Sequence, residues 1–66
     1  MADITKLTVY GELGDCISYD VGLNDWEAVC INEFTDRFEL KLRFAPGMKK
    51  IFNKALLVSW EITTNG

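Results

Sequence analysis

The stretch RFELKLRF at residues 37–44 decides the fold class, because its apolar and charged residues alternate without a break. Every second residue is apolar and shares one face of an extended chain: Phe38, Leu40, Leu42 and Phe44. Every charge falls on the other face. Such alternation is typical of a strand with one face against a core and the other in water. The stretch therefore predicts a half-buried β-strand.

Turn residues and a second candidate strand follow this stretch. Proline presets φ and glycine accepts positive φ, so the sequence Ala45-Pro46-Gly47 predicts a type II turn that ends the strand. The next segment, MKKIFNK at residues 48–54, fits either a short strand or one to two helical turns. We favour the strand.

Further strands are expected towards both ends of the chain. Residues 5–10 and 16–21 are rich in residues with β preference, and the connection ELGD between them has hairpin length and a glycine for the bend. Near the C-terminus, apolar residues alternate with polar ones: Val58, Trp60 and Ile62. This alternation predicts a closing strand.

The segment WEAVCINEF at residues 26–34 has two interpretations. Asn24 followed three residues later by Glu27 resembles the start of a helix, and apolar residues recur behind it at helical spacing. The abundance of Trp, Val, Cys, Ile and Phe favours a strand. We favour the strand and keep a helix at about residues 25–34 as the alternative.

Together these segments predict an all-β protein that forms a single domain over residues 1–66, since so short a chain leaves little for a second core. The expected architecture is a small antiparallel meander of five or six strands, with residues 48–52 beside residues 56–62. We expect it to curl into an SH3-like barrel, because a flat sheet would leave edges and apolar residues exposed. If residues 25–34 form a helix, the alternative is an α+β sheet with that helix across one face.

Composition excludes several classes of protein and site. With 48% apolar and 26% charged residues, the chain is neither disordered nor apolar enough in any run to span a membrane. The absence of histidine removes Ser-His and Cys-His nucleophilic sites and most zinc sites. No phosphate-binding glycine motif is present, and the acids Asp20, Asp25 and Glu27 are interpreted as turn and capping residues. We therefore expect no catalytic, cofactor-binding or metal-binding residues and no enzyme activity.

The two cysteines, Cys16 and Cys30, each lie inside an apolar stretch, and their spacing matches neither a CxxC motif nor a zinc pattern. We expect two buried, reduced thiols. The start MAD lacks the basic and apolar regions of a signal peptide, so we expect a cytoplasmic protein.

The net charge of −3 divides unevenly along the chain. Residues 1–36 hold eight acids and one base, net −7, whereas residues 37–66 hold six bases and two acids, net +4. The six bases form a candidate partner-binding face: Arg37, Lys41, Arg43, Lys49, Lys50 and Lys54. A basic face fits an oppositely charged protein or the phosphates of a nucleic acid. Opposite signs on the two halves also favour head-to-tail contacts between copies.

Part of the C-terminal half resembles a known RNA-binding family. The runs INEFTDRFELKL at residues 31–42 and IFNKAL at 51–56 are similar to the C-terminal strands of Sm-like RNA-binding proteins of the Hfq type, over about half the chain. The resemblance implies a small β-barrel that binds RNA. The Tyr-Lys-His signature of that type is absent, since Asn53 and Lys54 follow Phe52. We therefore assign the chain to no family.

The resulting hypothesis is a small non-catalytic protein that acts by protein–protein contact, with self-association as one form. A short edge strand that another chain can extend supports it. Phage and mobile-element accessory factors that block a host protein offer an analogy. The alternative is an Sm-like or other nucleic-acid-binding small β-barrel that uses the basic C-terminal face.

Overall fold

The computed structural model describes residues 3–65, which form six β-strands and one short 3-10 turn. In chain order the elements are β1 (Ile4–Tyr10), β2 (Cys16–Asp20), β3 (Ala28–Glu33), β4 (Arg37–Leu42), β5 (Ala45–Asn53), η1 (Lys54–Leu56) and β6 (Ser59–Thr64). The all-β class is confirmed, and the segment following the β4–β5 loop is a strand, as favoured from the sequence.

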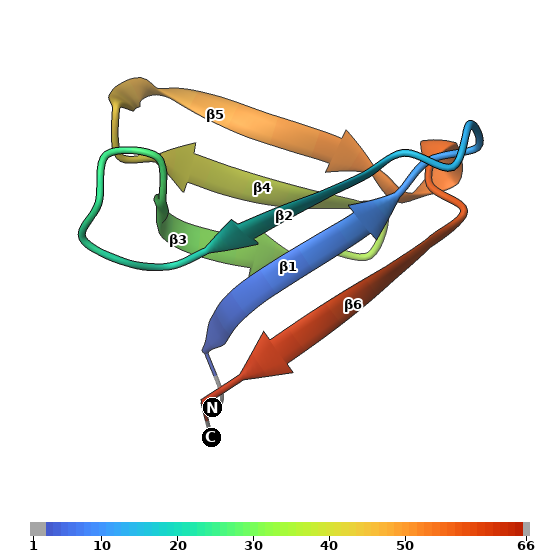
Figure 1. The fold of residues 1–66 in the computed structure, drawn as a ribbon, viewed down its shortest axis with the longest axis horizontal. Coiled ribbons are helices and arrows are strands. Elements are labelled where there is room, and N and C mark those ends of the chain that lie inside the picture. Colours follow the sequence, from blue (N-terminus) through green and yellow to red (C-terminus); the bar gives the residue numbers. More distant parts are fainter. Residues whose placement is uncertain (1–2, 66) are drawn as a thin grey trace.

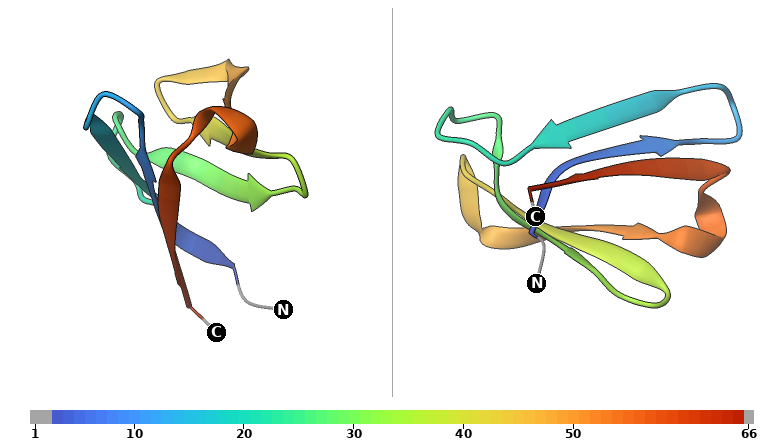
Figure 2. Two further views of the ribbon diagram at one scale, coloured as in Figure 1. Left: turned by 90° about the vertical axis from the view of Figure 1, so that its right-hand side faces the viewer. Right: turned by 90° about the horizontal axis from the view of Figure 1, so that it is seen from below.

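The strands form two antiparallel three-stranded sheets, with the order β2-β1-β6 in one and β3-β4-β5 in the other (Figure 1). The chain is not one continuous meander. At the end of β5, η1 carries the chain to the other sheet, where β6 pairs with β1 (Figure 2). The prediction that β5 lies beside β6 is therefore wrong, because the two strands belong to different sheets.

No closed barrel is detected in residues 3–65, in contrast to the SH3-like barrel expected from the sequence. Aromatic side chains of the two sheets also contact one another. Tyr19 of β2 lies against Phe52 of β5 with ring centroids 6.0 Å apart, and Phe38 of β4 meets Trp60 of β6 edge-on at 5.6 Å. An isolated bridge between Val21 and Ala28 links the residue after β2 to β3, but within residues 3–65 the β2 and β5 edges do not pair in a ladder.

The core lies between the two sheets. Its buried members come from β1, β3 and β4: Leu7, Val9, Ala28, Ile31, Phe38 and Leu40. Phe38 and Leu40 follow the alternation that predicted their burial. Phe44 does not, because β4 ends at Leu42 and Phe44 lies exposed in the loop beyond it.

Residues 25–34 form a loop followed by β3, so the strand interpretation is confirmed and the helix alternative is wrong. The helix-start signal nevertheless corresponds to real hydrogen bonds. The Asn24 N–H donates to the Glu27 carboxylate at 2.9 Å, and the Glu27 N–H donates to the Asn24 carbonyl at 3.0 Å. These bonds close a single turn, after which pairing with β4 draws the chain into a strand.

The β4–β5 hairpin loop consists of Arg43 and Phe44, because Leu42 pairs directly with Ala45. The type II turn expected at residues 45–47 is wrong, since these residues begin β5. A register shift follows at once and leaves part of β5 without partners in β4. Such a bulge accommodates the proline, which has no N–H to donate to a ladder.

Candidate functional site

The six bases of the predicted face do not form one continuous surface. Arg37 and Lys41 lie in β4, Arg43 in the hairpin loop, Lys49 and Lys50 in β5, and Lys54 in η1. Directly paired residues share a face of a sheet. Lys41 pairs with Lys49, whereas Lys50 pairs with the buried Leu40. Lys41 and Lys49 therefore lie on the outer face of the β3-β4-β5 sheet, and Lys50 lies on the other face.

Arg37 is engaged by neighbouring acids and by an aromatic ring. Its Nε donates to Glu39 at 2.6 Å, its Nη1 donates to Asp36 at 2.7 Å, and its guanidinium lies 4.3 Å from the centroid of the Phe34 ring. The hydrogen bonds from Arg37 lower the pKa of the Glu39 and Asp36 carboxyls below their ordinary values. The charge of Arg37 is thus balanced on the protein itself.

Lys54 and Arg43 are also held by internal contacts. The Lys54 Nζ lies 2.7 Å from a carboxylate oxygen of Glu33 and 5.3 Å from the centroid of the Trp60 ring. The Arg43 Nε donates to the Gly22 carbonyl at 2.8 Å. Both side chains join segments that are distant in sequence, so their contacts support the fold directly.

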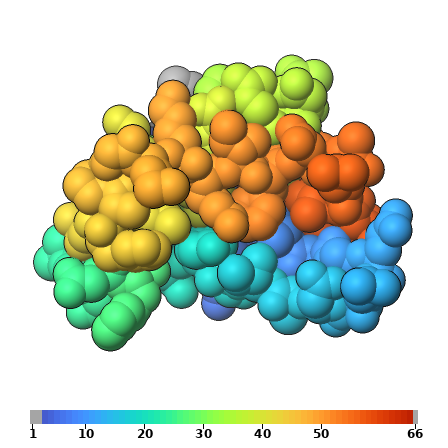
Figure 3. Space-filling model, turned by 90° about the horizontal axis from the view of Figure 1, so that it is seen from above, coloured from blue at the N-terminus to red at the C-terminus, as the bar shows by residue number. Residues whose placement is uncertain are grey.

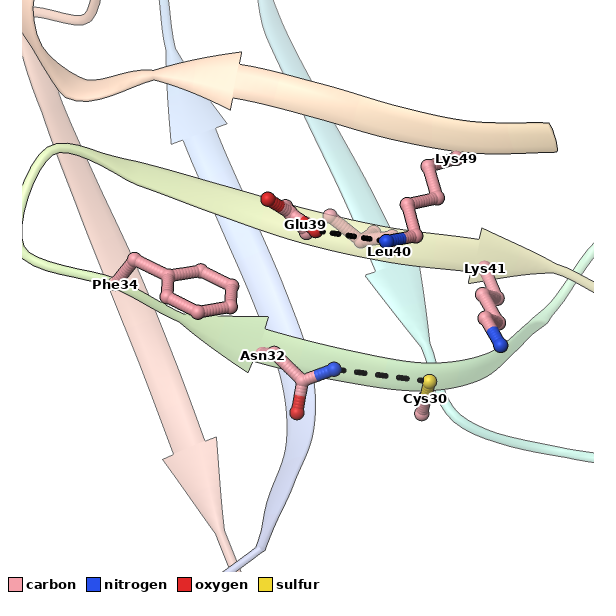
Figure 4. A pocket seen from close by; sticks show the side chains of 7 residues that line it. All are labelled: Cys30, Asn32, Phe34, Glu39, Leu40, Lys41 and Lys49. Atoms are coloured by element: carbon pink, nitrogen blue, oxygen red, sulfur yellow. Dashed lines mark hydrogen bonds and ion pairs between the residues drawn. The ribbon is translucent and has the colours of Figure 1, made fainter.

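A shallow hollow of about 260 Å³ lies on the outer face of the β3-β4-β5 sheet (Figure 4). It is lined by Cys30, Asn32, Phe34, Glu39, Leu40, Lys41 and Lys49. Like charges directly opposite one another destabilise a sheet, and the Lys41–Lys49 pair is of this kind. Glu39, 3.5 Å from the Lys49 Nζ, offsets part of this repulsion. The hollow therefore combines two bases, one acid and a partly exposed aromatic ring.

A second candidate surface is apolar, and the sequence did not reveal it. Four large apolar side chains, each 64–88% exposed, lie on the β2–β3 loop, in the β4–β5 loop and in the first half of β5: Leu23, Trp26, Phe44 and Met48. We call these four residues the Trp26 patch. The two segments lie at the same end of the long axis of the molecule and adjoin in the space-filling view (Figures 1 and 3). The only sequence signal was the position of Trp26 next to turn residues, outside any alternating pattern.

Arg43 holds the two segments of the Trp26 patch together. Its side chain donates to the Gly22 carbonyl, and its backbone N–H donates to the Glu27 carbonyl at 3.0 Å. The Glu27 carboxylate folds back beside Gly22, where any larger residue would collide with it, and accepts the Asn24 N–H. The loop that presents Trp26 is therefore fixed at both of its ends.

The opposite end of the molecule carries a smaller apolar surface. Three exposed side chains there come from the β1–β2 turn, η1 and the residues after η1: Leu13, Leu56 and Val58. We call them the Leu13 patch. The Val58 N–H donates to the Tyr10 carbonyl at 2.9 Å, which fixes this segment beside the β1–β2 turn. Figure 3 shows both segments adjoining at the end remote from the Trp26 patch.

Within residues 3–65, no group of histidine, cysteine, aspartate or glutamate residues could hold a metal ion. No helix in this range is long and apolar enough to cross a membrane. Both cysteines are free, but Cys16 is exposed and Cys30 is only partly buried, so the predicted burial of both thiols is wrong. Cys16 pairs with Tyr10, which places its side chain on the outer face of the β2-β1-β6 sheet.

Comparison with models of known protein families, with characterised proteins and with solved structures finds no match for this chain.

Proposed function

We propose that this chain is a non-catalytic interaction module that binds another protein chain through the Trp26 patch. The observation that carries the proposal is the gathering of four exposed apolar side chains on two segments that Arg43 ties together. Contiguous apolar surface on a soluble domain marks interaction sites. Tryptophan is also among the residues that contribute most to binding at protein interfaces.

The binding contribution of Trp26 can be approximated from its exposure. A tryptophan buries on the order of 200 Å², and Trp26 is 80% exposed. At roughly 25 cal/mol per Å² this corresponds to about 4 kcal/mol of transfer free energy on full burial. Because hydrogen bonds hold both ends of the loop, binding costs less backbone entropy, and the main entropic cost is the rotamer freedom of the exposed side chain. One anchor of this kind supports a weak complex, and the neighbouring apolar residues extend it.

Site-specific photocrosslinking tests this proposal. A photoreactive amino acid at Met48 should crosslink to a defined protein in the cells that contain this chain. The yield should fall when Trp26→Ser is added, because the main anchor is lost. The same photoreactive group at Ser18, on the polar outer face of β2, is the matched control. Equal crosslinking yields at Met48 and Ser18 would contradict the proposal. So would a yield at Met48 that does not change when Trp26→Ser is added.

A second candidate function is binding of single-stranded nucleic acid in the hollow on the β3-β4-β5 sheet. The observation that favours it is the Lys41–Lys49 pair beside Phe34, which is 41% exposed. Bases that neutralise phosphates and rings that stack on nucleobases are the two elements of such sites. Because the other bases are engaged or lie elsewhere, this site uses two of the six predicted residues.

Neighbouring lysines provide a matched pair of variants for this second function. Lys49 lies on the outer face and Lys50 on the other face, so Lys49→Glu should abolish binding whereas Lys50→Glu should largely preserve it. Fluorescence anisotropy with short single-stranded RNA and DNA at low and moderate salt measures both variants. Absence of binding at low salt, or equal losses in the two variants, would refute this function.

We also propose that the two sheets have the strand arrangement of the SH3-like barrel expected from the sequence, with the edges of β2 and β5 left unjoined. The support for this is that the last strand, β6, pairs with the first strand, β1, directly after η1. Amide hydrogen exchange along the facing edges of β2 and β5 tests the idea. Protection of amides on both edges would indicate a closed barrel in solution, and rapid exchange would indicate open sheets.

A further inference from the structure

We infer that the occupant of the Trp26 patch is a second copy of this chain, which contributes its Leu13 patch in a head-to-tail contact. The inference rests on the proposed interaction role of the Trp26 patch and names its partner. The two patches lie at opposite ends of the 30 Å long axis (Figures 1 and 3). A chain with an apolar surface at each end can therefore contact one copy through each.

Charge complementarity favours contact between unlike ends. Lys49 and Lys50 directly follow Met48 of the Trp26 patch, while Glu12 and Asp15 flank the turn that carries Leu13. All four charged residues are exposed. The described part of the chain contains no ion pair of Lys50, Glu12 or Asp15, and Lys49 has only the 3.5 Å contact to Glu39. Apolar contact between the ends would therefore bring exposed bases towards exposed acids.

The same charges disfavour contact between like ends. Two Trp26 patches in contact would bring Lys49 and Lys50, which lie on opposite faces of β5, towards the same bases of the other copy, and two Leu13 patches would bring Glu12 and Asp15 towards the same acids. Like charges placed together across an interface oppose association. Exposed Asp25 and partly exposed Glu27 flank Trp26 on the loop half of the Trp26 patch, so the complementarity with the acidic turn is confined to the hairpin half. A contact of unlike ends is heterologous, and repeated contacts form a ring or an open filament.

The size of the ends sets the strength of the contact. The two shorter dimensions of the molecule are 26 and 18 Å, so an end can bury on the order of 500 Å² per chain, less than the roughly 800 Å² per partner of a standard interface. Interfaces of this size are weak and transient. We therefore expect association in the micromolar to millimolar range of protein concentration and a monomer at high dilution.

Sedimentation velocity and light scattering of single variants and of their mixture test the inference. Trp26→Ser removes the anchor of one end, and Leu13→Lys adds a base to the acidic turn at the other end. Ile51→Ser is the control, because Ile51 is a half-exposed apolar residue on the outer face of β5, away from both ends. All three sites are exposed, and circular dichroism verifies that each variant keeps the fold.

The wild type and Ile51→Ser should gain mass with concentration beyond 7.5 kDa. Each end variant alone should lose this gain. An equimolar mixture of Trp26→Ser and Leu13→Lys should form dimers and nothing larger, because each variant keeps the one end that the other lacks. A mixture that stays monomeric would refute the contact between unlike ends. A monomeric wild type at every concentration would refute self-association, yet a Met48 crosslink to a different protein would leave the proposed interaction role intact.

Discussion

The hydrogen bond from Arg43 to the Gly22 carbonyl offers the sharpest test of how the Trp26 patch is held. The Arg43 Nε donates at 2.8 Å from a partly buried position, and the bond joins residues 21 positions apart in sequence. Hydrogen bonds that involve a charged group contribute roughly 1.5–3 kcal/mol to stability. Because Arg43 is only partly buried, we take the lower end, about 1.5 kcal/mol. For a domain of this size, that loss corresponds to a decrease in Tm of about 6–12 °C.

The assay compares Arg43→Ala with Lys41→Ala, which removes a base that has no ion pair within residues 3–65 and, because it also removes the repulsion from Lys49, should leave the Tm unchanged or slightly raised. Thermal unfolding gives the change in Tm. Amide hydrogen exchange gives the local effect: exchange at Gly22 and Glu27 should accelerate about tenfold for a loss near 1.4 kcal/mol. The Gly11 amide, bonded to the Asp15 carbonyl at the opposite end, should change only with global stability. The role of this bond would be refuted if Arg43→Ala had the same Tm as Lys41→Ala and its loop amides stayed protected from exchange.

Three further predictions concern the core, a turn and a carboxylate. Phe38→Ala removes a fully buried ring, so it should lower the free energy of unfolding by about 3–5 kcal/mol. This is a large part of the roughly 3–10 kcal/mol expected for the whole domain. A cooperative thermal transition near the wild-type Tm, followed by circular dichroism, would contradict this prediction. Gly14→Ala should lower the free energy of unfolding in urea by about 1 kcal/mol, because φ at Gly14 is 81°. Gly47→Ala, with open space around it, should leave this free energy unchanged. Equal effects of the two substitutions would refute the role of the positive φ at Gly14. Because Arg37 lowers the pKa of Glu39, the stability from this pair is present above the ordinary glutamate pKa of about 4.3 and is lost as pH falls through the folded-state pKa. The Tm of Glu39→Gln should therefore decrease less than that of the wild type between pH 5 and pH 2, and parallel profiles would contradict the pairing.

The strands were predictable where burial on one face imposes a pattern on the sequence. In β4, Phe38 and Leu40 point to the core and the intervening residues point to water, which is the alternation that the sequence shows. The hairpin loop was not predictable by the same reasoning. Pro46 and Gly47 have strong turn preferences, but pairing of Leu42 with Ala45 places the loop earlier and moves the proline into a bulge. Register between strands is a tertiary property, and local preference gives way to it.

The candidate surfaces were less predictable than the strands. The sequence located the bases but not their partners, because the contacts of Arg43 with Gly22 and of Lys54 with Glu33 each span 21 positions. The contacts of Arg37 are local, because Asp36 is its neighbour in sequence and Glu39 lies two residues on, on the same face of one strand. Apolar residues in loops cause a different error, because an exposed one is mistaken for part of a strand. Trp26 was counted towards the strand predicted over residues 26–34, but β3 begins at Ala28, because composition does not separate an exposed tryptophan from a buried one.

The exposed ends and the modest core of this chain have a common physical origin. Two three-stranded sheets cover each other's inner faces, but nothing in residues 3–65 covers the loops at either end of the sheets. A chain of this length buries only about 60% of the surface that its unfolded form exposes, so apolar residues remain at those ends. If a second copy covers them, association removes apolar area from water without lengthening the chain. Folding and association are then coupled by mass action, since a contact made only by the folded chain stabilises that state in proportion to the logarithm of the concentration of its partner.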